Sequence, residues 1–176
     1  YSAVMSDGSI ANDFNASQNL CKNCGSIFIN YYPSNRLEQF FSDSYDVSDE
    51  VQDCQIVVSG KKSSKHSVIH KSLLNFCAQV PSNGYFLEIA CGNGILSSKY
   101  ADKHTKWECI AVDPSRNSGK MISKRVRFVN DFFDPSLFES QKFDVIVAHG
   151  ILNRTPTIKI LDNICKVAAP NAIISL

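Results

Sequence analysis

The sequence has little excess charge and no long apolar run, and these two absences exclude several classes of protein. Its 176 residues carry 18 Lys and Arg against 17 Asp and Glu, a formal net charge of +1. Such a chain has no global field that attracts nucleic acid or an anionic membrane. No apolar run approaches the roughly 20 residues that span a bilayer. The first residues also lack the charged segment followed by an apolar segment that is typical of a signal peptide. We therefore expect a soluble cytoplasmic protein without nucleic-acid or membrane partners.

The chain has an odd number of cysteines and does not begin with an initiator Met. Its seven cysteines argue against a disulfide framework. Four of them lie among apolar residues, where a thiol behaves as a small hydrophobic group: Cys77, Cys91, Cys109 and Cys165. The start at Tyr1 suggests that residues precede it in the natural protein. The length suits one globular domain with an accessory element.

Three segments are expected along the chain. Residues 1–45 form a lead-in: a polar loop to about residue 19, a Cys-x-x-Cys-Gly turn from Cys21 to Gly25 entering a short strand, and a helix capped by Ser34. Residues 46–84 form a linker, with a strand within 51–58 and a helix over 65–80. Residues 85–176 form the core domain.

The core domain shows a regular alternation of apolar runs and longer segments. The runs predict strands over 85–90, 107–112, 126–129, 143–148 and 172–176, and the segments between them are long enough to hold helices. This order predicts an α/β fold with a doubly wound, mostly parallel sheet that is covered on both faces. Because ligands bind at the carboxyl ends of such strands, the functional residues should follow each strand.

The first of these strand ends predicts a ligand-binding turn. Glu88 lies on the strand, and Ala90, Cys91, Gly92, Asn93 and Gly94 follow it before a helix. Two glycines allow a tight turn whose backbone N–H groups face a ligand. Taken alone, the pattern is also typical of an ordinary strand-to-helix turn.

Acidic residues follow the next two strands and favour a cofactor that contains adenosine. Asp113 stands nineteen residues after Gly94, where a carboxylate can accept both ribose hydroxyls; its alternative role is a helix cap before Pro114. After the third strand, Asp131 can accept from an adenine amino group and Phe132 can cover the ring. The alternatives there are a loop carboxylate and a core aromatic residue. The absence of a third glycine disfavours NAD.

These motifs together resemble those of class I S-adenosylmethionine-dependent methyltransferases, which have a Rossmann-like fold. The resemblance rests on Leu87-Glu88-Ile89-Ala90-Cys91-Gly92-Asn93-Gly94, Ala111-Val112-Asp113-Pro114-Ser115, Asn130-Asp131-Phe132-Phe133-Asp134, and residues 143–150 and 168–175. It implies a methyltransferase that binds S-adenosylmethionine through the residues already named and through Pro114, Ala148 and His149. The chain ends on the fifth strand, so the family's last helix and antiparallel strands are expected to be missing.

The first segment resembles the zinc-knuckle lead-in of methyltransferases of sugar and polysaccharide biosynthesis, including sugar C-methyltransferases. This resemblance implies zinc at Cys21 and Cys24 and a small-molecule acceptor such as a nucleotide-linked sugar. Those proteins carry a second Cys-x-x-Cys upstream, which this chain lacks. Zinc needs four ligands, and Cys54, Cys77 and His66 are only distant candidates. The alternative is a remnant that binds no metal.

The catalytic residue is left open. Sugar C-methyltransferases have a histidine after the fourth strand, and Arg154 stands at that place here. Arginine is a poor base, but it can clamp a phosphate or carboxylate on the substrate, with Asn153 beside it. His149 and Tyr45 are the remaining acid–base candidates, with purely structural roles as the alternative. Two other functions stay open: a binding module without catalysis, and an NAD-dependent enzyme.

Overall fold

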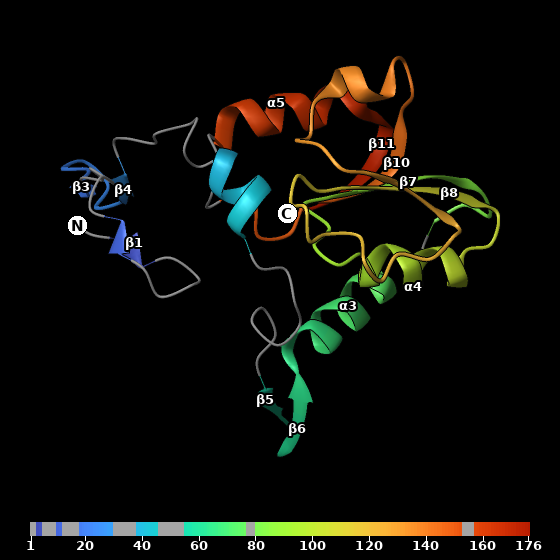
Figure 1. The fold of residues 1–176 in the computed structure, drawn as a ribbon, viewed down its shortest axis with the longest axis horizontal. Helices are drawn as coiled ribbons and strands as arrows, with labels where there is room; N and C mark the ends of the chain where they lie inside the picture. The colour runs from blue at the N-terminus through green and yellow to red at the C-terminus, as the bar shows by residue number, and fades with distance from the viewer. Residues whose placement is uncertain are drawn as a thin grey trace. The chain divides into compact units, whose positions relative to one another are not determined.

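The chain forms two compact units, Tyr1–Asp46 and Val47–Leu176, each of which is described by itself. The computed structural model describes residues 3–4, 10–11, 18–29, 38–45, 55–76, 80–152 and 157–176 (Figure 1). No helix in these ranges is long and apolar enough to cross a bilayer.

The first unit contains two short antiparallel strand pairs and a π-helical turn. Strand β1 (Ala3–Val4) pairs with β2 (Ile10–Ala11), and β3 (Gln18–Leu20) pairs with β4 (Ile27–Ile29) around the Cys-x-x-Cys turn. The turn η1 (Phe40–Ser44) brings Phe40, Phe41 and Tyr45 into edge-to-face contact. The expectation of a loop up to residue 19 was therefore wrong at β1, β2 and the start of β3.

A β-hairpin and a helix precede the sheet in the second unit. Strands β5 (Gln55–Val58) and β6 (Lys61–Ser64) pair through a two-residue turn in which Ser59 and Gly60 both have positive φ. Helix α3 (Lys65–Phe76) follows, and the Ser64 hydroxyl oxygen accepts the Ser67 N–H at 3.0 Å. The strand expected within 51–58 occupies 55–58, whereas β6 was not predicted.

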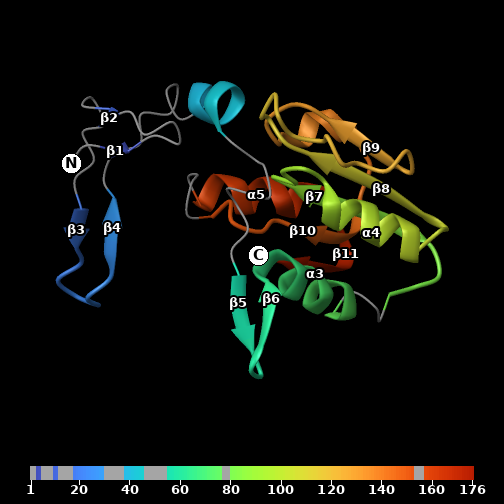
Figure 2. The same cartoon turned by 60° about the horizontal axis from the view of Figure 1, so that its bottom comes forward.

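The centre of the second unit is a five-stranded parallel sheet in the order β11-β10-β7-β8-β9 (Figure 2). The strands are β7 (Gly84–Ile89), β8 (Trp107–Val112), β9 (Val126–Val129), β10 (Phe143–Val147) and β11 (Ala168–Ser175). From β7 the chain builds outward through β8 and β9, then crosses to β10 on the other side. The topological switch point therefore lies at the carboxyl ends of β7 and β10. The predicted Rossmann-like class is confirmed.

Only two of the four connections in this sheet hold an α-helix. Helix α4 (Ile95–Lys103) joins β7 to β8, and α5 (Thr157–Val167) joins β10 to β11. The β9–β10 connection holds the 3-10 turn η2 (Pro135–Phe138), and the β8–β9 connection forms turns alone. The segments are long enough to hold helices, but residues 113–125 form none, because they contain Pro114 and Gly119 and no apolar stripe.

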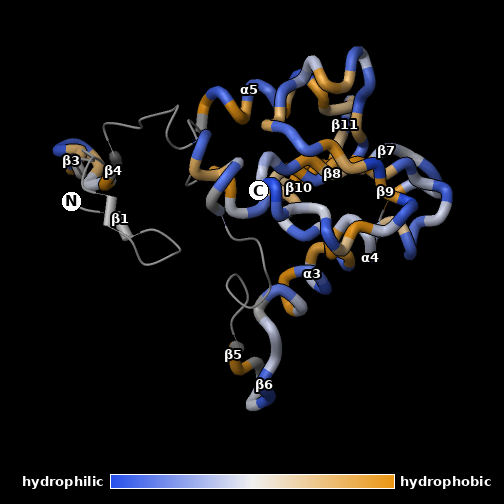
Figure 3. Tube along the Cα trace, viewed as in Figure 1, coloured by the Kyte–Doolittle hydropathy of each residue, from blue (hydrophilic) through white to orange (hydrophobic). Residues whose placement is uncertain are grey.

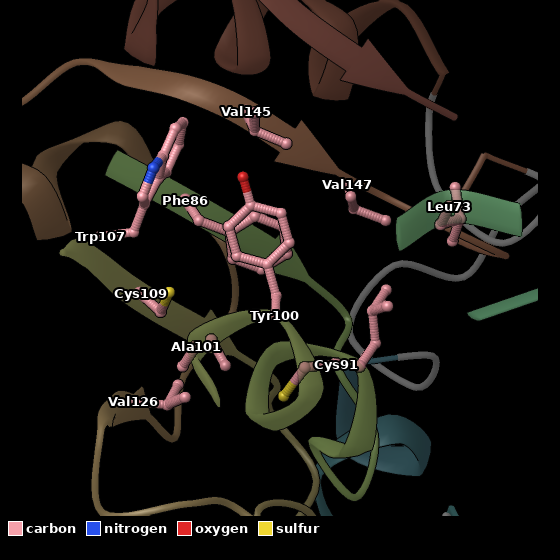
Figure 4. Close-up of a cluster of buried hydrophobic side chains, with 12 residues drawn as sticks. Leu73, Phe86, Cys91, Tyr100, Ala101, Trp107, Cys109, Val126, Val145 and Val147 are labelled. Carbon is pink, nitrogen blue, oxygen red and sulfur yellow. The ribbon is translucent and has the colours of Figure 1, made fainter. Parts of the chain in front are cut away.

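Two apolar clusters cover the two faces of the sheet. On one face the Tyr100 ring of α4 stacks on Phe86 with centroids 4.1 Å apart, and Leu73 of α3 joins the same cluster (Figure 4). On the other face Ile164 of α5 packs with Ile146 of β10. Figure 3 shows the apolar residues gathered along the central strands. Each large side chain buried in this way contributes about 1.5–3 kcal/mol.

The only tryptophan of the chain lies in the first of these clusters. Trp107 is buried, meets the Tyr100 ring edge-on at 5.5 Å, and donates from Nε1 to the Pro81 carbonyl oxygen at 3.1 Å. The indole N–H is therefore satisfied inside the core, as a buried tryptophan requires.

The cysteines of the described ranges are free thiols. Cys91 and Cys109 are buried, as predicted, and burial raises the pKa of Cys109 to about 12. Cys165 lies exposed on α5, so it does not behave there as the small hydrophobic group that its apolar sequence neighbours indicated. Cys77 and Cys54 lie outside the described residues.

Candidate functional site

The turn after β7 has a backbone that favours glycine. Ala90, Gly92 and Gly94 have φ of 58°, 56° and 81°, in the left-handed region. A Cβ atom on Gly94 would lie 1.9 Å from Cγ1 of Ile122. The turn is closed by hydrogen bonds from the Cys91 N–H to the Val112 carbonyl oxygen at 3.1 Å and from the Gly94 N–H to the Cys91 carbonyl oxygen at 3.0 Å.

The connection after β8 packs onto this turn through its backbone. The Gly119 N–H donates to the Gly92 carbonyl oxygen at 2.9 Å, and the Met121 N–H donates to the Asn93 carbonyl oxygen at 3.1 Å. The Ser98 hydroxyl of α4 accepts the N–H of Ser123 at 2.8 Å. The loop after β7 and the loop after β8 are therefore bound to each other at the carboxyl edge of the sheet.

Asp113 links the two loops. Its Oδ2 accepts the Gly92 N–H and its Oδ1 accepts the Ser115 N–H, both at 2.9 Å. Burial raises the pKa of Asp113, although these hydrogen bonds and the Ser118 hydroxyl act in the opposite direction. No helix follows, so the alternative role as a helix cap was wrong, and the side chain closes an Asx turn instead. A carboxylate offers about four acceptor positions, so the two N–H groups do not exhaust it.

Glu88 connects β7 to helix α4. Its Oε2 accepts the Ser97 N–H at 2.9 Å and the Ser97 hydroxyl as well, and both residues are buried. Burial raises the pKa of Glu88 to about 7, and the nearby Asp113 carboxylate adds to the rise. Both hydrogen-bond donors belong to Ser97 of α4, so Glu88 holds this helix to the end of β7, on either side of the glycine turn.

We expect this buried carboxyl group to make the stability of the second unit depend on pH. A native pKa of about 7 against an ordinary 4.5 means that the folded state binds the extra proton between these values. Stability should therefore fall as the pH rises from about 4.5 to 7, by up to about 3 kcal/mol. Glu88→Gln should remove this part of the slope in urea unfolding at pH 5 and pH 8.

The matched control is Glu108→Gln, which alters an exposed glutamate on β8. It should keep the wild-type dependence, and contributions from other titrating groups cancel in the comparison. An unchanged slope in Glu88→Gln would show that Glu88 titrates in its ordinary range.

The residues after β9 line the same edge. Asp131 is exposed, and its Oδ1 accepts the Phe132 N–H at 2.7 Å. The Phe132 ring is 40% exposed, so its alternative role as a core aromatic was wrong. Asn130, which was not predicted as a site residue, donates from Nδ2 to the carbonyl oxygens of Asp113 and Ser115 at 2.8 and 2.9 Å.

The end of β10 carries the remaining candidates of the second unit. Ala148 is buried and its N–H donates to the Ser175 carbonyl oxygen at 2.8 Å, whereas His149 is exposed at the switch point. Asn153 and Arg154 lie outside the described residues. Tyr45 belongs to the aromatic cluster of the first unit. Of the acid–base candidates, His149 is thus the one that the described residues place at the carboxyl edge of the sheet.

The Cys-x-x-Cys turn holds two thiols, Cys21 and Cys24, whereas a zinc ion needs four ligands. The Gly25 N–H donates to the Cys21 carbonyl oxygen at 2.9 Å, and the Cys24 thiol lies 3.2 Å from the Ser26 hydroxyl, which lowers the Cys24 pKa. Among the described residues, no three His, Cys, Asp or Glu side chains come together as a metal site. This part of the chain therefore does not fit a complete zinc site.

The glycine turn and Asp113 are thus joined directly by the hydrogen bond from the Gly92 N–H to Asp113 Oδ2. Pro114 lies within the Asp113–Ser115 turn. The hydrogen bonds that Ser97 makes to Glu88 and Asn130 makes to the Asp113 loop could not be predicted from the sequence. The partners are distant in sequence, and no local motif marks them.

Comparisons with known proteins point to one family. The family profile described as "Methyltransferase domain" matches residues 87–174. Coclaurine N-methyltransferase bound to N-methylheliamine and S-adenosylhomocysteine has a similar structure, with a TM-score of 0.55 and 15% identity over 80% of this chain and 43% of that one. An S-adenosylmethionine-dependent methyltransferase from Thiobacillus denitrificans, bound to S-adenosylhomocysteine, gives 0.50 and 14% over 73% and 52%. The chain thus spans about half the length of these proteins. No curated protein sequence matches it.

Proposed function

Because the chain belongs to the methyltransferase-domain family, we propose that it binds S-adenosylmethionine and transfers its methyl group to a small acceptor that carries phosphate. A nucleotide-linked sugar is the acceptor class that we favour. The observation that carries the proposal is the joined pair of loops at the switch point, with Asp113 between them.

Three features of this site support the choice of cofactor. The turn has left-handed φ at Ala90, Gly92 and Gly94, and Gly94 lets the loop that carries Ile122 pack directly onto it beside Asp113. The Asp113 carboxylate retains acceptor capacity for ribose hydroxyls. Both similar structures hold S-adenosylhomocysteine.

When bound, the cofactor would supply the methyl group of its sulfonium for in-line transfer to an acceptor nucleophile, with S-adenosylhomocysteine as the leaving group. The task of the protein is then to hold the cofactor and to align the acceptor with the methyl carbon. His149, exposed after β10, is the candidate base that would take a proton from the substrate that receives the methyl group. Arg154 remains our candidate for a substrate phosphate.

The charge of the segment before the sheet supports a phosphate-bearing acceptor. Residues 54–87 contain four lysines and two histidines and no Asp or Glu, a formal charge of +4 against +1 for the whole chain. Lys61 and Lys62 are exposed on the hairpin that projects from the start of α3 (Figure 2). Helix α3 packs on the sheet and is followed by β7, so its direction is opposite to that of β7. The start of α3 therefore lies toward the edge of the sheet where the strands have their carboxyl ends.

The test of the proposed function is calorimetric titration with S-adenosylhomocysteine, followed by a screen of nucleoside diphosphate sugars in methyl-transfer assays. Micromolar binding and turnover are the expected results. Binding without turnover on any acceptor would favour a binding module without catalysis, and absence of binding would refute the cofactor.

Removing two charges from the hairpin should weaken binding of the phosphate-bearing acceptor. We expect Lys61→Gln/Lys62→Gln to raise the Kd for a nucleoside diphosphate sugar several-fold at low salt, with S-adenosylhomocysteine present to fill the cofactor site. The effect should shrink as salt screens the lysines. Lys103→Gln/Lys106→Gln is the control, because it removes two exposed lysines at the opposite edge of the sheet. Equal losses in both pairs would refute a local role of the hairpin.

A further inference from the structure

We propose that Asn130 is a positioning residue that holds the loop of Asp113 in the shape that binds the ribose. The inference rests on the proposed function, since it assumes that Asp113 receives the ribose hydroxyls. It assigns a role to a residue one position before the predicted adenine contacts.

The contacts of Asn130 are made to the main chain of the Asp113 loop. Its Nδ2 donates to the Asp113 carbonyl oxygen at 2.8 Å and to the Ser115 carbonyl oxygen at 2.9 Å, and it lies 3.5 Å from the Ser118 hydroxyl. Two carbonyl oxygens on one side of the amide require the nitrogen there, because the amide oxygen would face two acceptors. Asn130 therefore bridges both sides of Pro114.

The loop needs such a bridge because it contains no helix. Residues 113–125 form turns between β8 and β9, so their carbonyl groups lack the regular partners of a helical ladder. The Ser118 hydroxyl and N–H both donate to the Ser115 carbonyl oxygen, at 2.5 and 3.1 Å. Asn130 supplies the hydrogen bond to the Asp113 carbonyl oxygen from the neighbouring strand end.

Asp113 is consequently held through both its side chain and its main chain. The carboxylate accepts from Gly92 and Ser115, the Asp113 N–H donates to the Val129 carbonyl oxygen at 3.2 Å, and Asn130 holds the following carbonyl group. A rotation of this peptide group would move the carboxylate away from its place. Small displacements of a binding group have large effects on affinity.

The test compares two ligands that differ only in the ribose. Wild type, Asn130→Ala and Asn130→Asp are titrated with S-adenosylhomocysteine and with its analogue that lacks both ribose hydroxyls. We expect Asn130→Ala to lose about tenfold in affinity for S-adenosylhomocysteine and less than about twofold for the analogue. Asn130→Asp should lose more than Asn130→Ala, because a carboxylate of the same shape would face two carbonyl oxygens.

The control is Asn117→Ala, which removes an exposed asparagine of the same loop whose Oδ1 accepts from Lys120 at 3.1 Å. It should leave both affinities unchanged. Equal losses for both ligands in the Asn130 variants, or no loss, would overturn the positioning role. Failure of wild type to bind S-adenosylhomocysteine would instead refute the proposed function, and the positioning role with it.

Discussion

Gly94→Ala is expected to destabilise the second unit by about 2–5 kcal/mol and to abolish binding of S-adenosylhomocysteine. Its φ of 81° costs an L-residue about 1–2 kcal/mol. The new methyl group would also lie 1.9 Å from Cγ1 and 2.6 Å from Cδ1 of Ile122, and such overpacking costs about 1–3 kcal/mol. Urea unfolding and calorimetric titration measure the two effects.

Two further variants separate backbone strain from steric overlap. Gly60→Ala places a methyl group at a similar φ of 76° with no atom within 4 Å, so it reports strain alone. Adding Ile122→Ala to Gly94→Ala removes the overlapping atoms and should restore part of the lost stability. If Gly94→Ala costs no more than Gly60→Ala, the close approach of Ile122 is not what requires glycine.

Asp113→Ala should reduce the affinity for S-adenosylhomocysteine by about 100-fold or more. The variant removes a charged acceptor for two ribose hydroxyls, and each such hydrogen bond contributes about 1.5–3 kcal/mol. It also leaves the N–H groups of Gly92 and Ser115 without their carboxylate partner, which loosens the joined loops. Calorimetric titration measures the loss directly.

The appropriate control for Asp113 is another carboxylate that binds a backbone N–H. Oδ2 of Asp144 accepts the Tyr85 N–H at 2.8 Å, at the amino end of β7 and thus at the opposite edge of the sheet. Asp144→Ala should lower stability while leaving the affinity for S-adenosylhomocysteine unchanged. Similar affinity losses in both variants would contradict a ribose contact at Asp113.

The order of elements in the sheet was predictable because its strands are short apolar runs with polar ends. The strands at 107–112 and 126–129 have the predicted bounds. Strand β11 begins at Ala168, four residues before the predicted start. Pro170 and Asn171 read as a turn, but an edge strand tolerates proline, and Asn171 takes a left-handed φ of 65° within the strand.

The support of the site could not be predicted in the same way. A glycine or an aspartate directly after a strand is a sequence signal of a binding loop, and this signal identified Gly94 and Asp113. Ser97 and Asn130 carry no such signal, since an exposed asparagine and a helical serine occur in any sequence. Their roles arise only when the fold brings α4 against β7 and the end of β9 against the Asp113 loop.

The burial of Trp107 makes the two units separately observable by fluorescence. Excitation at the red edge of the absorption band selects indole, and the only indole of the chain lies between the sheet and α4. Its emission therefore reports the solvation of the second unit alone, while circular dichroism reports both units together. Coincident transitions by the two probes would mean that the units unfold in one step. Separated transitions would mean that the first unit unfolds independently of the second.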